Sequence, residues 1–348
     1  MSLFATIRRT LPVAALAATF ALTPLASAQD STPAAEGVAP TPYEAPADIA
    51  DLEGTIAADG SSTVGPFTQA AAENFNGIAP NVDIAVNVSG TGGGFEAFCA
   101  GETDLQNASR PMAEDEAAIC AENGVEWYEF EVAYDGITVV VPESNTFLTC
   151  LTTESLASIW MGDITNYNEI DPSYPDLAIE LFGPGEDSGT YDFFNEEILG
   201  EDEAGETIAP AADYEPSEDD NTLVEGVSGT EGGLGHFGFT YYEENQDRLN
   251  VVSLSTDGTT DNCVEPTLET ISSTEYAPLS RPLYIYASAA SLAENTALQE
   301  FLRYAIADAD AIADSLGAVN APGEALVTSQ EKLEGAIDGS AEPDSAAA

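Results

Sequence analysis

The sequence predicts an α/β fold in which parallel sheets carry helices on both faces. Three observations predict this class. Segments with strand-like and helix-like spacing alternate through most of the 348 residues. Apolar residues alternate over 177–181, and a glycine-bearing turn over 182–190 joins them to helix-spaced apolar residues over 191–198. The same order of strand, turn and helix recurs over residues 82–95.

Apolar spacing also predicts the other elements. Residues 67–75 carry apolar side chains four positions apart and predict a helix, and residues 136–141 form a nearly unbroken apolar run that predicts a buried strand. Residues 156–160 predict another helix and residues 281–286 another strand. Spacings of three and four over residues 298–306 predict a long terminal helix. The length is sufficient for two lobes with cores of their own.

The N-terminus has the features of a secretion signal. Arg8 and Arg9 form a basic start, residues 11–25 are mostly apolar, and Ala26-Ser27-Ala28 matches a cleavage site. We expect residues 1–28 to be removed, by general secretion rather than by the twin-arginine route. The remaining protein is expected to be soluble and periplasmic.

The charge balance is strongly acidic and limits the classes of partner. The chain has 62 Asp and Glu against 7 Lys and Arg, and its only lysine is Lys332. Such a surface repels itself at low ionic strength, whereas molar salt shortens the screening length to about 3 Å. The composition therefore predicts a saline habitat. Nucleic acid and anionic membranes are poor partners for this surface.

Four cysteines fit an oxidising compartment: Cys99, Cys120, Cys150 and Cys263. Three pairings are possible, and nearness in sequence favours Cys99–Cys120, which leaves Cys150–Cys263 as a long-range link. A metal site is a weaker interpretation, because no Cys-x-x-Cys occurs and His236 is the only histidine. We expect no cofactor.

The candidate site is built from four segments rich in hydroxyl groups and backbone amides: residues 60–64, 89–95, 108–111 and 187–190. Each follows strand-like sequence or begins a helix, where free amides and the helix dipole favour an oxyanion. Capping of the helix is the alternative role for each segment taken alone. If all four lie at strand ends facing one crevice, they form a binding site. Their candidate ligands are Ser62, Thr63, Val64, Ser89, Thr91, Ser188, Gly189 and Thr190.

Arg110 is the expected cationic anchor of this site. A guanidinium grips two oxygens of a tetrahedral anion at once, and Arg110 lies between Ser109 and Pro111. A surface ion pair is the alternative. Arg281, between Ser280 and Pro282, is the competing candidate, and we expect it to be structural.

Asp135 is the expected determinant of selectivity. A carboxylate in an anion site favours a ligand that carries a proton, which hydrogen phosphate has and sulfate lacks at neutral pH. Glu186 or Asp187 could take this role instead, and a turn cap is the alternative for Asp135.

Four motifs together resemble the PstS-like periplasmic phosphate-binding proteins of phosphate ABC transporters: Ser61-Ser62-Thr63, Ser89-Gly90-Thr91-Gly92-Gly93-Gly94-Phe95, Ser109-Arg110-Pro111 and Asp187-Ser188-Gly189-Thr190. Residues 217–221, 234–242 and 280–283 match as well, so the resemblance covers residues 54–310. It implies a type II periplasmic binding fold, with two lobes joined by a hinge that close on one phosphate. Thr63, Val64, Thr91, Ser188, Gly189 and Thr190 would be direct ligands.

The resemblance also implies the domain organisation and the partners. Composition without periodicity predicts a flexible linker over residues 29–51 and a flexible tail over 336–348. The two-lobed fold that the resemblance implies would place 52–135 plus 278–335 in the first lobe and 136–277 in the second. A monomer would deliver phosphate to the membrane permease of an ABC importer. One departure from the best-known branch is that an arginine there stands where this chain has Pro184, and an acidic residue there stands at Arg110. This puts the assignment of the acceptor carboxylate in doubt.

Three other functions remain open at this point. A binding protein for another tetrahedral oxyanion, such as sulfate, molybdate or tungstate, would use the same donors. A secreted phosphatase is disfavoured, because one histidine and no activated nucleophile offer little catalytic chemistry. A surface or adhesion role is the third alternative.

Overall fold

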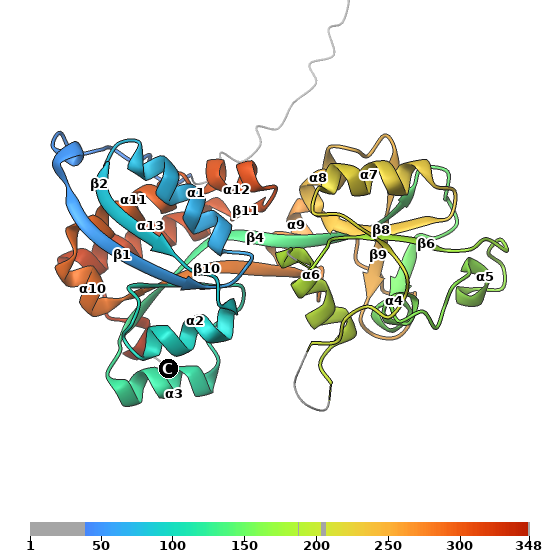
Figure 1. Ribbon diagram of the computed structural model, residues 1–348, viewed down its shortest axis with the longest axis horizontal. Helices are drawn as coiled ribbons and strands as arrows, with labels where there is room; N and C mark the ends of the chain where they lie inside the picture. The colour runs from blue at the N-terminus through green and yellow to red at the C-terminus, as the bar shows by residue number, and fades with distance from the viewer. Residues whose placement is uncertain (1–38, 187, 203–206, 347–348) are drawn as a thin grey trace, which may run out of the picture. The chain divides into compact units, whose positions relative to one another are not determined.

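The computed structural model describes residues 39–186, 188–202 and 207–346 (Figure 1). The expected signal peptide lies outside these residues. Two groups of strands share the long strand β4 (Trp127–Pro142). The first group contains β1 (Glu53–Gly60), β2 (Asn81–Val86), β3 (Leu105–Ala108), β10 (Ser280–Ser288) and β11 (Val319–Asn320). The second contains β5 (Cys150–Thr152), β6 (Glu180–Gly183), β7 (Glu215–Pro216), β8 (Gly233–Gly238) and β9 (Leu249–Ser255).

Helices pack on each group of strands (Figure 1). With the first group are α1 (Gly65–Asn76), α2 (Gly90–Cys99), α3 (Glu114–Asn123), α10 (Ala289–Glu294), α11 (Thr296–Ala307), α12 (Ala309–Leu316) and α13 (Gly323–Asp338). With the second are α4 (Thr153–Trp160), α5 (Tyr167–Ile170), α6 (Gly189–Phe194), α7 (Asp220–Gly229) and α8 (Phe239–Glu243). α9 (Leu268–Ser272) contacts β10, β11 and the shared strand β4. Shorter turns are η1 (Ile49–Asp51), η2 (Asn195–Leu199) and η3 (Asp344–Ala346).

The sheet is mixed, which corrects the expectation of parallel sheets. β1 pairs in parallel with β2 and β3, and β6 with β7 and β8. β4, however, runs antiparallel to β10, β8 and β9. Its partners change at one point, because Gly136 pairs with Ser280 of β10 and Ile137 with Gly238 of β8. β4 therefore passes from one group of strands to the other, and its direction sets the antiparallel pairs.

Most of the elements predicted from apolar spacing are present. The helices over 67–75 and 156–160 are confirmed as α1 and α4, and the strands over 136–141 and 281–286 lie within β4 and β10. The helix over 298–306 is α11, but it is not terminal, since α12 and α13 follow it. The strand expected over 177–181 forms later, at Glu180–Gly183. The α/β class itself is confirmed.

Two segments expected to be flexible instead make fixed contacts. Near the N-terminus of the described chain, the Tyr43 hydroxyl donates to Glu300 (3.0 Å) and its ring meets Tyr304 edge-on at 5.7 Å. Near the C-terminus, the Asp344 carboxylate accepts from Lys332 Nζ (3.0 Å) and from the Glu129 amide (2.8 Å). These contacts attach part of each segment to the rest of the described chain, and the flexibility of the two segments stays a prediction.

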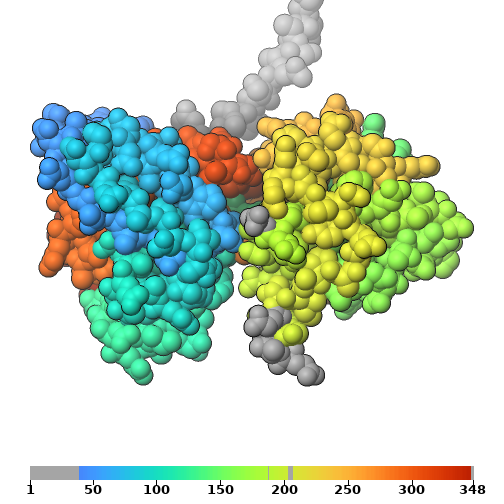
Figure 2. All heavy atoms as spheres, in the orientation of Figure 1, coloured from blue at the N-terminus to red at the C-terminus, as the bar shows by residue number. Residues whose placement is uncertain are grey.

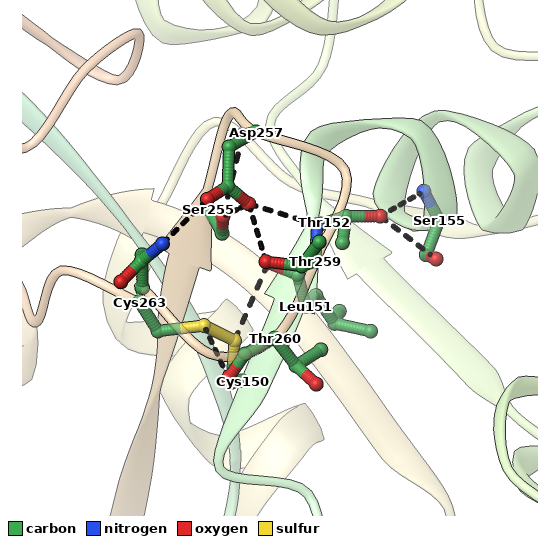
Figure 3. Close-up of a disulfide and its surroundings, with 10 residues drawn as sticks. Cys150, Leu151, Thr152, Ser155, Ser255, Asp257, Thr259, Thr260 and Cys263 are labelled. Atoms are coloured by element: carbon green, nitrogen blue, oxygen red, sulfur yellow. Dashed lines mark hydrogen bonds between the residues drawn. A yellow bond between two sulfur atoms is a disulfide. The ribbon is translucent and has the colours of Figure 1, made fainter.

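Both favoured disulfides are present, and each ties two elements together. Cys99 of α2 bonds to Cys120 of α3. Cys150, the first residue of β5, bonds to Cys263 in the loop after β9 (Figure 3). The same loop is held by the Asp257 carboxylate, which accepts from Ser255 Oγ (2.8 Å) and Thr259 N (2.8 Å). Side-chain hydrogen bonds, the largest from Asn262, lower the pKa of Asp257, so this anchor persists in acid.

His236 is buried in an aromatic cluster of the second group of strands. Its ring stacks on Phe194 at 3.7 Å and meets Trp160 edge-on at 4.6 Å. Burial lowers the pKa of His236 from 6.5 to about 3. The folded protein therefore holds this ring neutral, whereas the unfolded chain binds a proton below pH 6.5.

His236→Gln is expected to make the free energy of unfolding depend less on pH between pH 6.5 and pH 3. The pKa of His236 is lower in the folded state than in the unfolded chain. Above pH 6.5 the ring is neutral in both states, so it adds no pH dependence to the free energy of unfolding there. Between pH 6.5 and 3 the free energy of unfolding of the wild type falls by up to about 1.4 kcal/mol per pH unit through this group. Urea titrations at pH 7, 5 and 4 in molar salt measure it. If the free energy of unfolding falls equally with pH in wild type and variant, His236 does not cause the loss of stability in acid.

Candidate oxyanion-binding site

Two adjoining cavities, of about 490 and 170 Å³, bring most of the predicted site residues together. Both are lined by Ser62 and Thr63. The larger is also lined by Ser61, Gly90, Thr91, Gly92, Ser109, Arg110, Pro111, Asp192, Glu196, Glu197, Ala277, Pro278, Ser280, Arg281 and Pro282. The smaller adds Asp135, Gly189, Thr190, Asp220 and Tyr241, with apolar residues around them. In the space-filling view, a groove runs between the blue and cyan surface that includes α1 and α2 and the yellow-green surface of α6 and α7 (Figure 2).

The first wall of the site is the connection from β1 to α1. Gly60 ends the strand with a φ of 132°, which a side chain would strain, and turns the chain toward α1. Ser61 Oγ accepts from the amides of Thr63 (3.1 Å) and Val64 (3.4 Å). Val64 has a buried side chain and precedes the first helical residue, so only its backbone is suited to a ligand. The connection is therefore a helix N-terminus at which Ser61 holds the amides of Thr63 and Val64, while Ser62 and Thr63 line the cavities.

The second wall comes from α2 and from the end of β3. Thr91 lies in the first turn of α2, and its Oγ1 is 3.0 Å from Oγ of the buried Ser109. Ser89 differs from the expectation, since it is exposed and lines neither cavity; it stands at the N-cap position of α2 without a side-chain capping hydrogen bond. Its amide donates to Asp59 (3.0 Å) instead. The helix begins at Gly90, within the motif, so Ser89 precedes it and Thr91 lies in its first turn.

The third wall is the N-terminus of α6. Ser188 caps this helix by accepting from the Thr190 amide (3.2 Å), and it lines neither cavity. Gly189 and Thr190 do line the smaller cavity. A methyl group at Gly189 would lie 2.8 Å from Thr63 Oγ1, so α6 and the first wall approach closely here. Glu186 is exposed and lines neither cavity, and Asp187 lies outside the described residues.

Arg281, which we expected to be structural, is the more buried of the two arginines that line the larger cavity. Its Nη2 donates to Thr63 Oγ1 (2.9 Å) and to Asp135 Oδ2 (3.3 Å). The guanidinium lies 3.5 Å from the centre of the Phe193 ring, and 12 % of the side chain is exposed. Burial raises the pKa of Asp135 and lowers the pKa of Arg281, while their attraction opposes both shifts. Register places the two opposite each other on β10 and β4.

Arg110 is more exposed and is already paired. Two of its nitrogens donate to the Glu116 carboxylate at 2.8 and 2.9 Å, and 41 % of its side chain is exposed. It lines the larger cavity and faces the Phe95 ring at 5.7 Å. The ion pair that was the alternative for this residue is therefore formed. Arg110 still supplies positive charge to one side of the cavity, but Glu116 offsets much of it.

The sequence analysis did not predict several of the residues that line the cavities. Asp192, Glu196 and Glu197 line the larger cavity, and Asp192 accepts from Ser62 Oγ (3.1 Å). Asp220 lines the smaller one. In so acidic a chain, no sequence signal separates these carboxylates from those on the surface. A third Ser-Gly-Thr, at 228–230, lies at the end of α7 and lines neither cavity.

The described residues contain no helix that is long and apolar enough to span a membrane, and no cluster of side chains suited to holding a metal ion.

Two groups of strands around a cavity rimmed by helix N-termini characterise the periplasmic binding proteins. The family model of the PBP superfamily domain matches residues 31–309, and the chain belongs to this superfamily. Protein SphX of Synechocystis is 43 % identical over 275 residues, which cover 78 % of this chain and 80 % of that one. The phosphate-binding protein PstS of Staphylococcus saprophyticus is 37 % identical over 291 residues, which cover 84 % of this chain and 88 % of that one. Within the superfamily, the chain is a member of the PstS-like phosphate-binding proteins.

A solved structure is similar over most of its length. The possible phosphate-binding protein from Planctomyces limnophilus is 42 % identical, with a TM-score of 0.76, and covers 82 % of this chain and 99 % of that chain. The fold is thus the two-lobed type II periplasmic binding fold, which confirms the expected class. The family consists of binding proteins rather than enzymes.

Proposed function

We propose that this chain is an exported solute-binding protein that captures inorganic phosphate and delivers it to the permease of an ABC importer. The observation that carries the proposal is the meeting of donors from distant segments. Ser62 and Thr63, Thr91, Arg281, and Gly189 with Thr190 all line two adjoining cavities. Hydroxyl groups, helix-start amides and one guanidinium are the donors that bind a tetrahedral oxyanion.

The names of the relatives support phosphate as the ligand. The Staphylococcus protein is named a phosphate-binding protein, and the Planctomyces structure is described as a possible one. The proposed ligands are Ser62, Thr63, Val64, Thr91, Arg281, Gly189 and Thr190, with Arg110 and Ser188 contributing from outside the direct contacts. We further propose a lobe boundary at 135/136 and 277/278, removal of residues 1–28, a periplasmic monomer and no nucleic-acid partner.

An acidic chain can bind an anion because the hydrogen-bond donors lie close to the ligand and most carboxylates lie far from it. Donors about 3 Å from the ligand act across little water, whereas remote surface carboxylates are screened by salt. Calorimetric titration of residues 29–348 with phosphate in molar sodium chloride tests the proposal. We expect saturable binding of one phosphate per chain, and no heat of binding at millimolar phosphate would refute the proposal. Sulfate binding as tight as phosphate would favour the broader class of oxyanions.

Gly189→Ala is expected to weaken phosphate binding about tenfold or more. The added methyl group would lie 2.8 Å from Thr63 Oγ1 and 3.1 Å from Thr63 N, so one wall of the site must move away from the other. Alanine favours helices more than glycine does, so the melting temperature should not fall. Gly229→Ala is the matched control, since a methyl group there meets no atom within 4 Å. Equal phosphate affinities of the two variants would show that binding does not require the close contact between Gly189 and Thr63.

A further inference from the structure

Gln106 of β3 is a buried side chain that lies between two of the turns that build the site. It is fully buried, and its strand runs between β1 and β10. It lines neither cavity, so it does not contact a ligand there. Burying a side-chain amide costs free energy unless hydrogen bonds compensate for the lost water. The contacts of its nitrogen and its oxygen therefore indicate what Gln106 does.

The nitrogen of this amide holds the first turn of α2. Nε2 of Gln106 donates to the carbonyl of Thr91 (2.9 Å). A flipped amide would set Oε1 against that carbonyl oxygen, so this bond fixes the orientation of the side chain. The Thr91 hydroxyl is held by the end of the same strand, because its Oγ1 accepts from the Ser109 amide (3.3 Å) and lies 3.0 Å from Ser109 Oγ. β3 thus holds Thr91 by both its backbone and its side chain.

The oxygen of the same amide fills space that two glycines leave open. A methyl group at Gly60 would lie 2.7 Å from Gln106 Oε1. A methyl group at Gly94 would overlap Oε1 and lie 2.5 Å from Gly60 Cα. The end of β1 and the first turns of α2 therefore meet on Gln106. Among the described residues, buried Oε1 has no hydrogen-bond partner, so the side chain keeps this position at a cost in stability.

We propose that Gln106 is a positioning residue of the oxyanion site, which fixes the first turn of α2 against the turn that follows β1. The inference rests on the proposed phosphate function. Thr91 from α2 and Thr63 from the turn after β1 line the larger cavity, so a shift of α2 changes the distances from one anion to both walls. Hydrogen bonds weaken steeply when their geometry departs from the optimum. The role of Gln106 is therefore expressed in affinity more than in stability.

Gln106→Met is expected to weaken phosphate binding about tenfold or more, as the loss of one well-placed hydrogen bond predicts. The melting temperature should stay near that of wild type. Methionine is close to glutamine in size and adapts to its space, and it removes the unpartnered Oε1 together with the bond to Thr91, so the two effects on stability oppose each other. Calorimetric titration and thermal melting in molar sodium chloride measure affinity and stability.

Hydrogen exchange adds a local measurement of the same role. Without the bond to the Thr91 carbonyl, the first turns of α2 should open more often. We expect the amides of residues 94–97 to exchange about tenfold faster in Gln106→Met than in wild type. Mass spectrometry of peptides from α2 measures this rate in the protein without phosphate.

Thr138→Val is the matched control, since it removes one buried hydrogen bond outside the site. Thr138 is fully buried in β4, and its Oγ1 donates to the Phe237 carbonyl (3.1 Å). It lines neither cavity. We expect its melting temperature to fall, because valine cannot donate to that carbonyl. Its phosphate affinity and the exchange of residues 94–97 should equal those of wild type.

Gly94→Ala disturbs the same contact from the side of α2. Its methyl group would overlap Gln106 Oε1, while the amide of Gln106 itself is unchanged. We expect this variant also to bind phosphate more weakly than wild type. It keeps the proposal open to test if Gln106→Met does not fold, and wild-type affinity in folded Gly94→Ala would refute the positioning role.

The remaining outcomes separate this inference from the proposed function. If folded Gln106→Met binds phosphate as tightly as wild type, the positioning role is refuted while the phosphate function stands. A lower melting temperature with unchanged affinity has the same meaning, because Gln106 would then serve packing alone. If wild type itself binds no phosphate, the proposed function fails, and the inference fails with it.

Discussion

Arg281→Ala is expected to raise the dissociation constant for phosphate at least a hundredfold. The guanidinium is largely buried between Phe193 and Asp135, and it also holds the hydroxyl of Thr63. Removing one member of a buried, hydrogen-bonded charge pair typically costs about 2–5 kcal/mol of binding energy. The melting temperature should fall too, because the Asp135 carboxylate is left without its cation. Calorimetric titration and thermal melting separate the two losses.

Arg110→Ala is the matched comparison, since the same group is removed from the exposed side of the larger cavity. Its ion pair with Glu116 is partly solvated, so we expect a loss of no more than about tenfold. The double variant Arg281→Ala with Asp135→Asn removes the orphaned carboxylate and should still bind weakly if Arg281 attracts the anion directly. A larger loss for Arg110→Ala than for Arg281→Ala would return the role of anchor to Arg110.

Removing the Cys150–Cys263 disulfide is expected to lower the free energy of unfolding more than removing Cys99–Cys120. The two bonds close segments with sequence separations of 113 and 21 residues. In the chain-entropy model these loops correspond to about 5 and about 3 kcal/mol of stabilisation, as upper values. Paired serine variants, unfolded by urea in molar salt, measure the difference.

The Asp257 network bears on how this second prediction could fail. Its hydrogen bonds join Asp257 to Ser255 and Thr259 in the loop that carries Cys263 (Figure 3), and Asn262 donates to the same carboxylate. All members of this network lie within residues 255–262, so it does not replace the link to Cys150, and equal losses of stability for the two pairs of variants are not expected. That result would contradict the entropic account. Both pairs should retain phosphate binding, because neither disulfide lines the cavities.

Local signals predicted the helices and the walls of the site. The serine and threonine motifs precede α1 and α6, and glycines mark the turns where the strands end, because capping and turn chemistry act over a few residues. The direction of the strands was not accessible in this way. β4 runs antiparallel to its neighbours as a result of long connections, which apolar spacing does not record.

The sequence also could not show which of the two arginines, Arg110 or Arg281, is the more buried in the site. Arg110 and Arg281 stand between a serine and a proline in identical local settings. Only the pairing of β10 with β4 places Arg281 against Asp135, and those residues are 146 positions apart. Asp220 lies in a polar run that reads as a solvated loop. Its place in the cavity depends on how α7 packs against the strands.

A crystal structure of the complex with phosphate, grown from sodium chloride without sulfate, tests the central claim most directly. The proposal predicts one phosphate with oxygens about 3 Å from donors of Thr63, Thr91, Arg281 and Thr190. A phosphate bound elsewhere, such as in the cavity beside Arg303 and Gln330, with these four residues untouched, would contradict it.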